Sequence, residues 1–239
     1  MFNKLISAGL VTGLTAGGYA YAAMSPGSQL FGRTLIAGSE IQEVALTFDD
    51  GPNDPYTEQL LELLARHQVR ATFFLVGSYV RQRPDIARSI HRAGHLLGNH
   101  TMVHPSLLWA SPARVREELA GCTATIEDAT GERVQWFRPP FGARRPDVLR
   151  AAAELGLIPV MWNITAHDWD ATDSVILAAR VQRGLQVNQR RHRSTNVLLH
   201  DGGHRGFGID RSVTLAATKI LLEAWAGSSL RFVTVDAWQ

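Results

Sequence analysis

The stretch IQEVALTFDDGPNDPYTEQLLELLARHQ, residues 41–68, joins an apolar run to an amphipathic run through a turn rich in aspartate, glycine and proline. The first eight residues predict a β-strand, and leucines recurring on one side of residues 57–68 predict a helix. Between them stand two adjacent carboxylates, Asp49 and Asp50, which repel each other if they are buried. A loop start is one explanation, because Asp, Gly, Pro and Asn all favour turns. A functional role requires partners elsewhere in the chain.

The alternation of strand and helix continues to the C-terminus. Further strands are predicted at residues 70–77, 95–100, 135–140, 157–164, 195–200 and 230–236, and further helices at 83–94, 111–130, 145–156, 172–185 and 210–227. Strands that alternate with helices through right-handed crossovers form a parallel sheet or barrel. The sequence therefore predicts an α/β fold in residues 41–239, a distorted (β/α) barrel of about seven parallel strands that is similar to a TIM barrel.

Length and composition restrict the class of protein. The chain has 239 residues, 45% hydrophobic and 19% charged, which suits one large α/β domain. A single cysteine, Cys122, excludes a disulfide within the chain, and its helical setting predicts a packing residue. The formal net charge of +2 is too small to indicate nucleic acid binding. The basic run at 189–194 has no interleaved aromatic residues and predicts a solvated loop.

The N-terminus differs in kind from the rest of the chain. Lys4 is followed by a long stretch without charge and then by the small-residue run AYAA. This pattern predicts that residues 1–23 are a secretory signal with an Ala20-Tyr21-Ala22 cleavage site, or a retained membrane anchor. An ordinary buried helix is the alternative. Residues 24–40 are expected to be a linker or cap, and the domain to work outside the cytoplasmic membrane, as an exported, periplasmic, cell-envelope or membrane-anchored protein.

Polar side chains follow the predicted strands at or near the points where they end. They are Asp49 and Asp50 with the first strand, His100 and His104 with the third, Arg138 with the fourth, Asp168 and Trp169 with the fifth, and His200 and Asp201 with the sixth. The carboxyl ends of parallel strands open onto one face of a barrel, where barrel enzymes build their sites. The sequence therefore predicts that these clusters converge.

The histidines at i and i+4, His100 and His104, suggest a metal site. On one helical turn both imidazoles would face the same way, and Pro105 limits how far that turn continues. With an aspartate from a neighbouring strand end they make a set that suits a divalent ion such as zinc and leaves a position open for water. One carboxylate of the aspartate pair would then bind the ion, and its neighbour would accept a proton from the activated water.

Five motifs occur in an order that resembles the polysaccharide deacetylases of carbohydrate esterase family four, the nodulation-factor deacetylase homology group. They are TFDDGP at 47–52, HTMVHP at 100–105, RPPFG at 138–142, HDW at 167–169 and LLH at 198–200. The resemblance covers residues 44–201. Each motif alone is a weak signal, but the five together are specific.

The resemblance implies a role for each matching residue. The implied metal ligands are Asp50, His100 and His104. The implied catalytic residues are Asp49 as the base, Arg138 paired with the base, His200 as the general acid and Asp168 paired with the acid. The implied substrate-binding residues are Trp169 and Leu198, which form a slot for the acetyl methyl group, and Pro139, Pro140 and Gly142, which shape the turn beside the sugar groove. The histidines without a motif match are expected to be structural or solvent-exposed: His67, His91, His95, His167, His192 and His204.

The implied function is hydrolysis of N-acetyl groups on a polysaccharide that contains N-acetylglucosamine, either peptidoglycan or a chitin-type polymer. The expected ion is Zn²⁺, with Co²⁺ or Ni²⁺ as alternatives. One departure bears on the pocket rim: Thr165 stands where the fourth motif often has its first aspartate. Two other functions stay open, a hydrolase of a small amide, imide or formyl-sugar on the same fold, and a non-catalytic carbohydrate-binding relative. The presence of Asp49 and His200 argues against the second.

Overall fold

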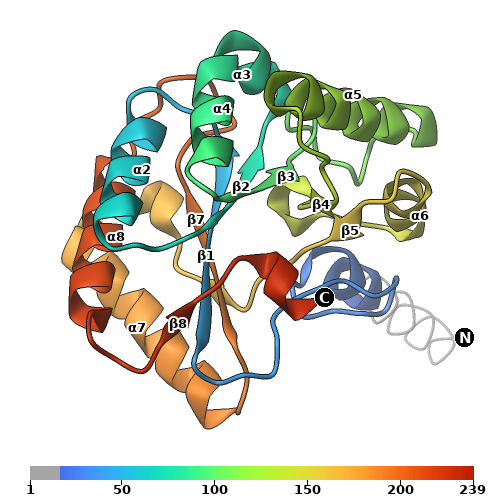
Figure 1. Cartoon of the computed structure of the whole chain (residues 1–239). Helices are drawn as coiled ribbons and strands as arrows, with labels where there is room; N and C mark the ends of the chain where they lie inside the picture. Colours follow the sequence, from blue (N-terminus) through green and yellow to red (C-terminus); the bar gives the residue numbers. More distant parts are fainter. Residues whose placement is uncertain (1–16) are drawn as a thin grey trace, which may run out of the picture.

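The structure is a computed structural model and describes residues 17–239. One parallel sheet lies at its centre, in the order β5-β4-β3-β2-β1-β7-β6, with β8 also pairing with β1 (Figure 1). Its strands are β1 (Glu43–Gly51), β2 (Thr72–Leu75), β3 (Leu96–Asn99), β4 (Trp136–Phe137), β5 (Ile158–Pro159), β6 (Ile164–Thr165), β7 (Thr195–His200) and β8 (Arg231–Phe232). The predicted fold, a distorted (β/α) barrel, is confirmed.

The strand predicted at residues 157–164 is two short strands on opposite edges of the sheet. β5 pairs with β4, whereas β6 pairs with β7. Between them the chain leaves the sheet, and Val160 forms an isolated parallel bridge with Leu35. Two edge strands that are only a few residues apart in the chain require the sheet to curl. Within residues 17–239 the sheet therefore has eight strands instead of about seven.

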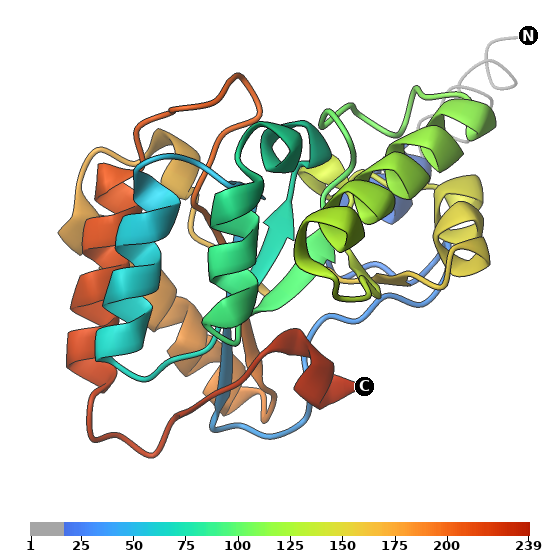
Figure 2. The ribbon, with the colours of Figure 1, turned by 45° about the horizontal axis from the view of Figure 1, so that its top comes forward.

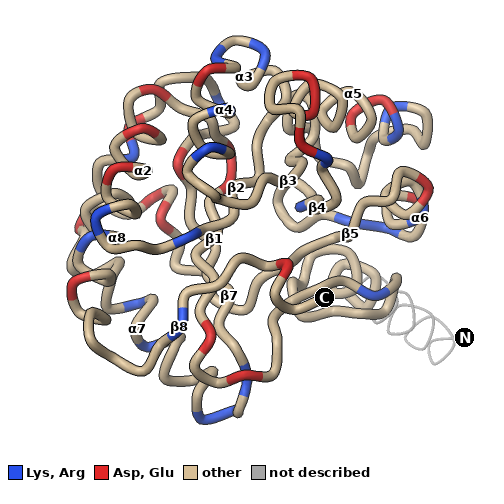
Figure 3. Tube along the Cα trace, in the orientation of Figure 1, with Lys and Arg blue, Asp and Glu red and all other residues tan. Residues whose placement is uncertain are grey.

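Helices cover the outside of the curled sheet. They are α2 (Tyr56–Arg66), α3 (Gly77–Gln82), α4 (Pro84–Arg92), α5 (Pro112–Thr130), α6 (Pro146–Glu154), α7 (Ser174–Arg190) and α8 (Ser212–Trp225), with 3-10 turns η1 (Pro140–Gly142), η2 (Asp168–Asp170) and η3 (Val235–Trp238). Figure 2 shows α8, α2 and α4 packed side by side and α5 beside α6. Every predicted helix is present, and the additional helix α3 is short. Charges of both signs are interspersed on the outer helices (Figure 3).

Local signals set the helix ends. The Ser111 side chain accepts a hydrogen bond from the Arg114 N–H and caps α5, and Asp173 caps α7 in the same way. Cys122 is fully buried in α5, where its thiol donates to the carbonyl of Leu75. The prediction of a packing cysteine is therefore confirmed.

Alternation along β1 decides which side chains reach the inside of the curl. Val44, Leu46 and Phe48 join the core beneath the helices, and Ala45 joins the separate inner cluster. Successive side chains of a strand point to opposite faces, so Asp49 also points inward. In the β1–β7 register Asp49 stands opposite His200, which brings two predicted site residues together.

The start of the described chain is fastened to the domain. Residues 17–24 are helical, and Ala22 and Ala23 are buried. The fully buried Arg144 donates hydrogen bonds to the carbonyls of Ser25 and Ser28, both at 2.7 Å. Among residues 17–239 no helix is long and apolar enough to cross a membrane. Most of the predicted leader lies in residues 1–16, outside the described residues, and the boundaries at residues 23 and 40 stay predictions.

Candidate active site

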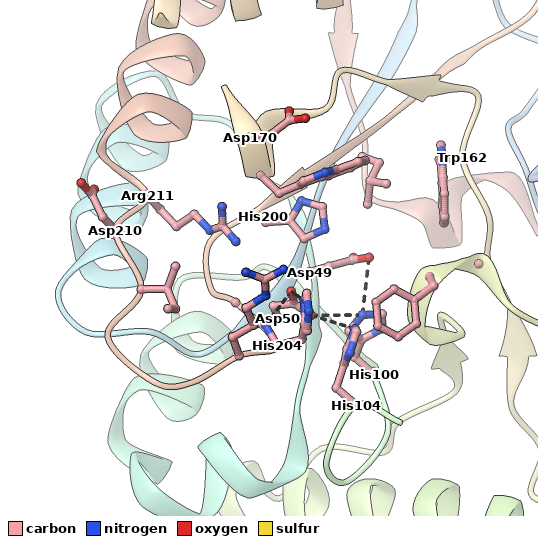
Figure 4. A pocket seen from close by; sticks show the side chains of 17 residues that line it. Asp49, Asp50, His100, His104, Trp162, Asp170, His200, His204, Asp210 and Arg211 are labelled. Atoms are coloured by element: carbon pink, nitrogen blue, oxygen red, sulfur yellow. Dashed lines mark hydrogen bonds and ion pairs between the residues drawn. The ribbon is translucent and has the colours of Figure 1, made fainter. Parts of the chain in front are cut away.

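A cavity of about 780 Å³ opens at the carboxyl ends of the strands (Figure 4). Eight of the predicted residues line it: Asp49, Asp50, His100, His104, Gly142, Trp169, Leu198 and His200. Arg138 and Asp168 are buried and contact lining residues from behind. Pro139 and Pro140 are buried and do not line the cavity, because the turn presents Phe141 and Gly142 to it instead. The prediction that strand-end clusters converge is confirmed for these elements.

The two adjacent aspartates reach the same cavity through an irregularity in β1. In a regular strand they would point to opposite faces. Asp50 has a φ of 69°, and the pairing of β1 with β2 shifts register between Asp49 and Gly51. Aspartate tolerates this left-handed conformation better than most residues. The bulge therefore turns Asp50 inward beside Asp49.

Asp50, His100 and His104 have the geometry of a metal-ligand set. Asp50 Oδ1 lies 3.4 Å from His100 Nε2 and 3.1 Å from His104 Nε2, and it is buried without a hydrogen bond to any described residue. A tetrahedral ion with bonds of about 2.0–2.2 Å keeps its ligand atoms roughly 3.3–3.6 Å apart. These three side chains therefore fit a divalent cation. Burial raises the pKa of Asp50, but the two histidines outweigh it and hold that pKa well below its usual range.

The two histidines lie in a loop, so the prediction of a helical turn is wrong. Thr101 and His104 have positive φ values of 69° and 56°, which a helix does not allow. The buried carboxylate of Glu118 shapes the loop by accepting the N–H groups of residues 102 and 103, at 2.7 and 3.0 Å. The His104 N–H donates to the Thr101 hydroxyl oxygen at 3.0 Å. Backbone bonds to side chains, rather than helical spacing, bring the two rings together.

Outer hydrogen bonds orient the ligand atoms toward the common point. His100 Nδ1 bonds the carbonyl of Arg138 at 2.8 Å, which leaves Nε2 facing Asp50. The backbone N–H of His204 donates to Asp50 Oδ2 at 3.1 Å, which leaves Oδ1 for an ion. Such outer partners fix the orientation of metal ligands in known metal sites.

Asp49 is held by the predicted arginine. Arg138 is fully buried, and its Nη1 donates to Asp49 Oδ1 at 2.9 Å and to the Thr47 hydroxyl at 2.7 Å. The guanidinium carbon lies 4.1 Å from the centre of the Phe74 ring. The other carboxylate oxygen, Asp49 Oδ2, lies 3.7 Å from His100 Nε2. One oxygen is therefore anchored, and the other faces the metal-ligand set.

His200 and Asp168 form the second predicted pair. His200 Nδ1 lies 2.8 Å from Asp168 Oδ1, while Asp168 Oδ2 accepts the His200 N–H at 2.8 Å and the Thr214 hydroxyl at 3.0 Å. Burial alone would lower the pKa of His200, but the charge and hydrogen bond of Asp168 outweigh it and raise that pKa to about 9. Burial alone would raise the pKa of Asp168, and His200 reverses this to a lowered value. The geometry thus favours an imidazolium at neutral pH.

Apolar side chains form the wall beside these polar groups. Leu198 packs with Met161 and Trp162 in a small buried cluster, and Trp169 stands edge-on to His200 with ring centres 5.4 Å apart. The Trp162 indole N–H donates to the Thr165 hydroxyl at 2.5 Å. The residue that departs from the fourth motif therefore supports a wall of the cavity.

Among the lining residues that were not predicted, His204 and Phe141 contact the candidate metal ligand His104. His204, expected to be structural or exposed, stacks on His104 with ring centres 5.2 Å apart. Phe141 meets His104 edge-on at 4.7 Å and has a strained φ of 58°. In the sequence, the signal that could have drawn attention to His204 was the glycine pair that precedes it. The structure shows why a glycine is needed there: a Cβ on Gly202 would lie 1.9 Å from the carbonyl oxygen of Asp50. That close approach seats the loop of His204 on the bulge of β1.

Fold and site together define an α/β protein that carries an aspartate pair, a histidine–aspartate pair and a residue set able to hold a metal ion on one rim. A family model described as polysaccharide deacetylase matches residues 38–160. The chain is 39% identical over 173 residues to a chitooligosaccharide deacetylase from Rhizobium leguminosarum bv. trifolii, which covers 70% of this chain and 74% of the relative. The chain therefore belongs to the polysaccharide deacetylase family, hydrolases that act on N-acetyl amides.

Solved structures agree with this assignment. The Bc1960 peptidoglycan N-acetylglucosamine deacetylase is 28% identical, with a TM-score of 0.75 over 85% of this chain and 91% of that chain. BA3943, a CE4 family pseudoenzyme from Bacillus anthracis, is also 28% identical, with a TM-score of 0.72 over 82% and 65%. Because the fold accommodates both enzymes and a pseudoenzyme, activity depends on the side chains of the site.

Proposed function

We propose that the protein removes N-acetyl groups from a polysaccharide containing N-acetylglucosamine, with a divalent cation held by Asp50, His100 and His104. One observation carries the proposal: the unpartnered Asp50 Oδ1 meets two imidazole nitrogens beside a second, separately anchored carboxylate, that of Asp49. The relatives named for chitooligosaccharides and for peptidoglycan N-acetylglucosamine support this substrate class.

Zinc suits two imidazoles and one carboxylate, and cobalt or nickel would fit the same donors. When bound, the cation would act as a Lewis acid toward the acetamide carbonyl and lower the pKa of water. Asp50 supplies the anionic ligand, and its pKa, held well below the usual range, keeps it ionised.

Asp49 is the proposed general base. Arg138 anchors Oδ1 at 2.9 Å, so Oδ2 is aimed at the ligand set and is free to accept a proton. As the oxygen of water bonds to the acetamide carbon, its proton passes to this carboxylate. The buried arginine orients the carboxylate before the reaction begins.

His200 is the proposed general acid. Asp168 holds Nδ1 at 2.8 Å, so the Nε2 proton is the one available to the leaving nitrogen. As the C–N bond breaks, this proton passes to the amine, and acetate and a glucosamine unit are the products. Trp169 and Leu198 would enclose the acetyl methyl group in an apolar slot. The leader predicted from the sequence supports an extracytoplasmic site of action.

Acetate release tests the proposal. We expect the purified full chain with Zn²⁺ to release acetate from N-acetylglucosamine oligomers. The Asp49→Asn variant should retain the metal but lose roughly three or more orders of magnitude in rate, because the base is removed and its shape is kept. His104→Ala should lose both metal and activity, whereas the matched variant His67→Ala should retain both.

Two outcomes would contradict the proposal. If formate or a ring-opened imide were the product instead of acetate, the small-molecule hydrolase would be the better assignment. If Asp49→Asn turned over at nearly the parental rate, Asp49 would not be the base.

A further inference from the structure

Arg211 places a guanidinium whose terminal N–H groups have no partner among residues 17–239 in the wall of the active cavity. Only 9% of the residue is exposed, and it lies immediately before α8. Its Nε donates to the carbonyl of Gly202 at 2.5 Å, and within residues 17–239 the guanidinium makes no other hydrogen bond or ion pair. Figure 4 shows the group directed from the cavity wall toward His200. Its terminal N–H groups are therefore available to a molecule in the cavity.

The other buried arginines are satisfied. Arg138 bonds Asp49, and Arg144 bonds three backbone carbonyls. The terminal N–H groups of Arg211 instead face the cavity, where an anionic group of a ligand could accept them. The nearby carboxylate of Asp168 is already occupied by His200 and Thr214.

The position of Arg211 is fixed before any ligand binds. Gly202, which holds its Nε, belongs to the loop whose N–H groups at residues 201 and 202 donate to the Asp49 carbonyl at 3.2 and 3.4 Å. The guanidinium is thus tied to the same backbone that carries the base. A fork of N–H donors held in place binds a carboxylate at little entropic cost.

We propose that Arg211 binds a carboxylate carried by the substrate close to the acetamido group, so that the enzyme prefers strands containing an acidic amino sugar to neutral N-acetylglucosamine oligomers. The inference rests on the proposed function, because it places the acetamido nitrogen beside His200. The 3-O-lactyl ether of muramic acid has the required chemistry, since carbon 3 adjoins the carbon that carries the acetamido group. On such a strand the muramic acid unit is the one deacetylated, and the products are acetate and its free amine. The geometry therefore favours the glycan strand of peptidoglycan over a chitin-type polymer.

A carboxylate could also come from the released acetate, and the experiment separates the two sources. Acetate release is measured with the full chain on neutral N-acetylglucosamine oligomers and on alternating N-acetylglucosamine–N-acetylmuramic acid strands with free lactyl carboxylates. We expect Arg211→Gln to raise KM on the acidic strands roughly tenfold to hundredfold, the range of a charge-assisted hydrogen bond, and to change KM on neutral oligomers less than about twofold. Arg211→Lys should restore part of the loss.

Arg205→Gln is the matched control, because Arg205 lines the same cavity but is exposed. It should leave the ratio of the two KM values unchanged, and Zn²⁺ titration should give the same affinity for the parent and for Arg211→Gln. An equal loss on both substrates would assign Arg211 to holding the loop. A raised acetate inhibition constant with an unchanged substrate ratio would assign it to product binding. Either result overturns the Arg211 proposal alone, whereas a parent that releases no acetate from either substrate overturns the proposed function.

Discussion

Replacing Asp168 by asparagine should remove the negative charge that favours a protonated His200, while a side chain of the same shape stays in place. The His200 N–H and the Thr214 hydroxyl both donate to Asp168 Oδ2, at 2.8 and 3.0 Å. The amide oxygen of the variant must take this position, because a buried donor without an acceptor is costly. The amide NH₂ then faces His200 Nδ1, where Oδ1 stood at 2.8 Å. An N–H donor cannot face a protonated Nδ1, so the variant favours the neutral imidazole.

The size of the effect follows from the pKa of His200. In the parent, burial lowers this pKa, and Asp168 is the leading cause of its rise to about 9. Without that carboxylate, burial should bring the pKa to its ordinary 6.5 or below. At about pH 8 the protonated fraction then falls from about 0.9 to about 0.03 or less, a loss of roughly 30-fold or more. The charge of a bound cation would offset the smaller contributions that Asp50 and Asp49 make to the pKa of His200. The rate of the parent should therefore fall with rising pH at about pH 9 or slightly lower.

The assay is the ratio of variant to parental acetate release between about pH 5.5 and 9.5 with Zn²⁺ in excess. The ratio cancels the titration of every group that the two proteins share. We expect it to rise as the pH falls below about 8, and the control Asp170→Asn, which alters another carboxylate lining the cavity, to give a flat ratio. A ratio for Asp168→Asn that does not change with pH would refute the acid role of His200.

Stability gives a second measurement of the same pair. The folded-state pKa of His200 lies above its ordinary value, so the pair stabilises the fold fully below about pH 6.5, and the contribution disappears as the pH rises through about 9. Urea unfolding of the parent should show this decline. Asp168→Asn should remove it.

Three further predictions concern the frame of the site. Arg138→Met should lower the free energy of unfolding, measured in urea melts, by about 3–5 kcal/mol, because Asp49 is left as a buried unpaired charge. The double variant Arg138→Met with Asp49→Asn should recover part of this lost stability. Gly202→Ala should abolish Zn²⁺ binding measured by titration, since a Cβ would lie 1.9 Å from a backbone oxygen, whereas Gly206→Ala, with nothing within 4 Å, should bind normally. Removing the cation with a chelator should abolish activity and lower the Tm, because an ion at about 100 times its Kd stabilises the fold by about 2.7 kcal/mol.

The fold was predictable where a local pattern decides the structure. Strand β7 occupies the predicted residues 195–200, because its apolar run is bounded by polar residues at both ends. The prediction of a single strand at 157–164 was wrong, because nothing in LIPVMWNI marks the point where the chain leaves the sheet. Its two halves pair with β4 and β7, which lie at opposite sides of the curl. Only the closure of the sheet decides that separation, and closure is not a local property.

The site was predictable from motif residues but not from the contacts among them. The convergence of His100 and His104 follows from Glu118, a buried carboxylate in α5 that the sequence gives no reason to connect with the loop. His204 was missed for the same reason, because its neighbours Asp50 and His104 come from other segments. Motifs along the chain predicted which residues gather in the cavity, and tertiary contacts set their geometry.

The bulge at Asp50 explains how the proposed base and a proposed metal ligand can be adjacent in sequence. In a regular strand the next carboxylate on the same face would be two residues away, roughly 6.6 Å along the strand. Here the two carboxylates come from adjacent residues, and Asp49 Oδ2 and Asp50 Oδ1 lie 3.7 and 3.4 Å from His100 Nε2. The left-handed φ of 69° at Asp50 removes the alternation at this one step. A tight acid pair at the end of a buried strand thus requires the irregular backbone, and the loop carrying Gly202 holds that backbone in place.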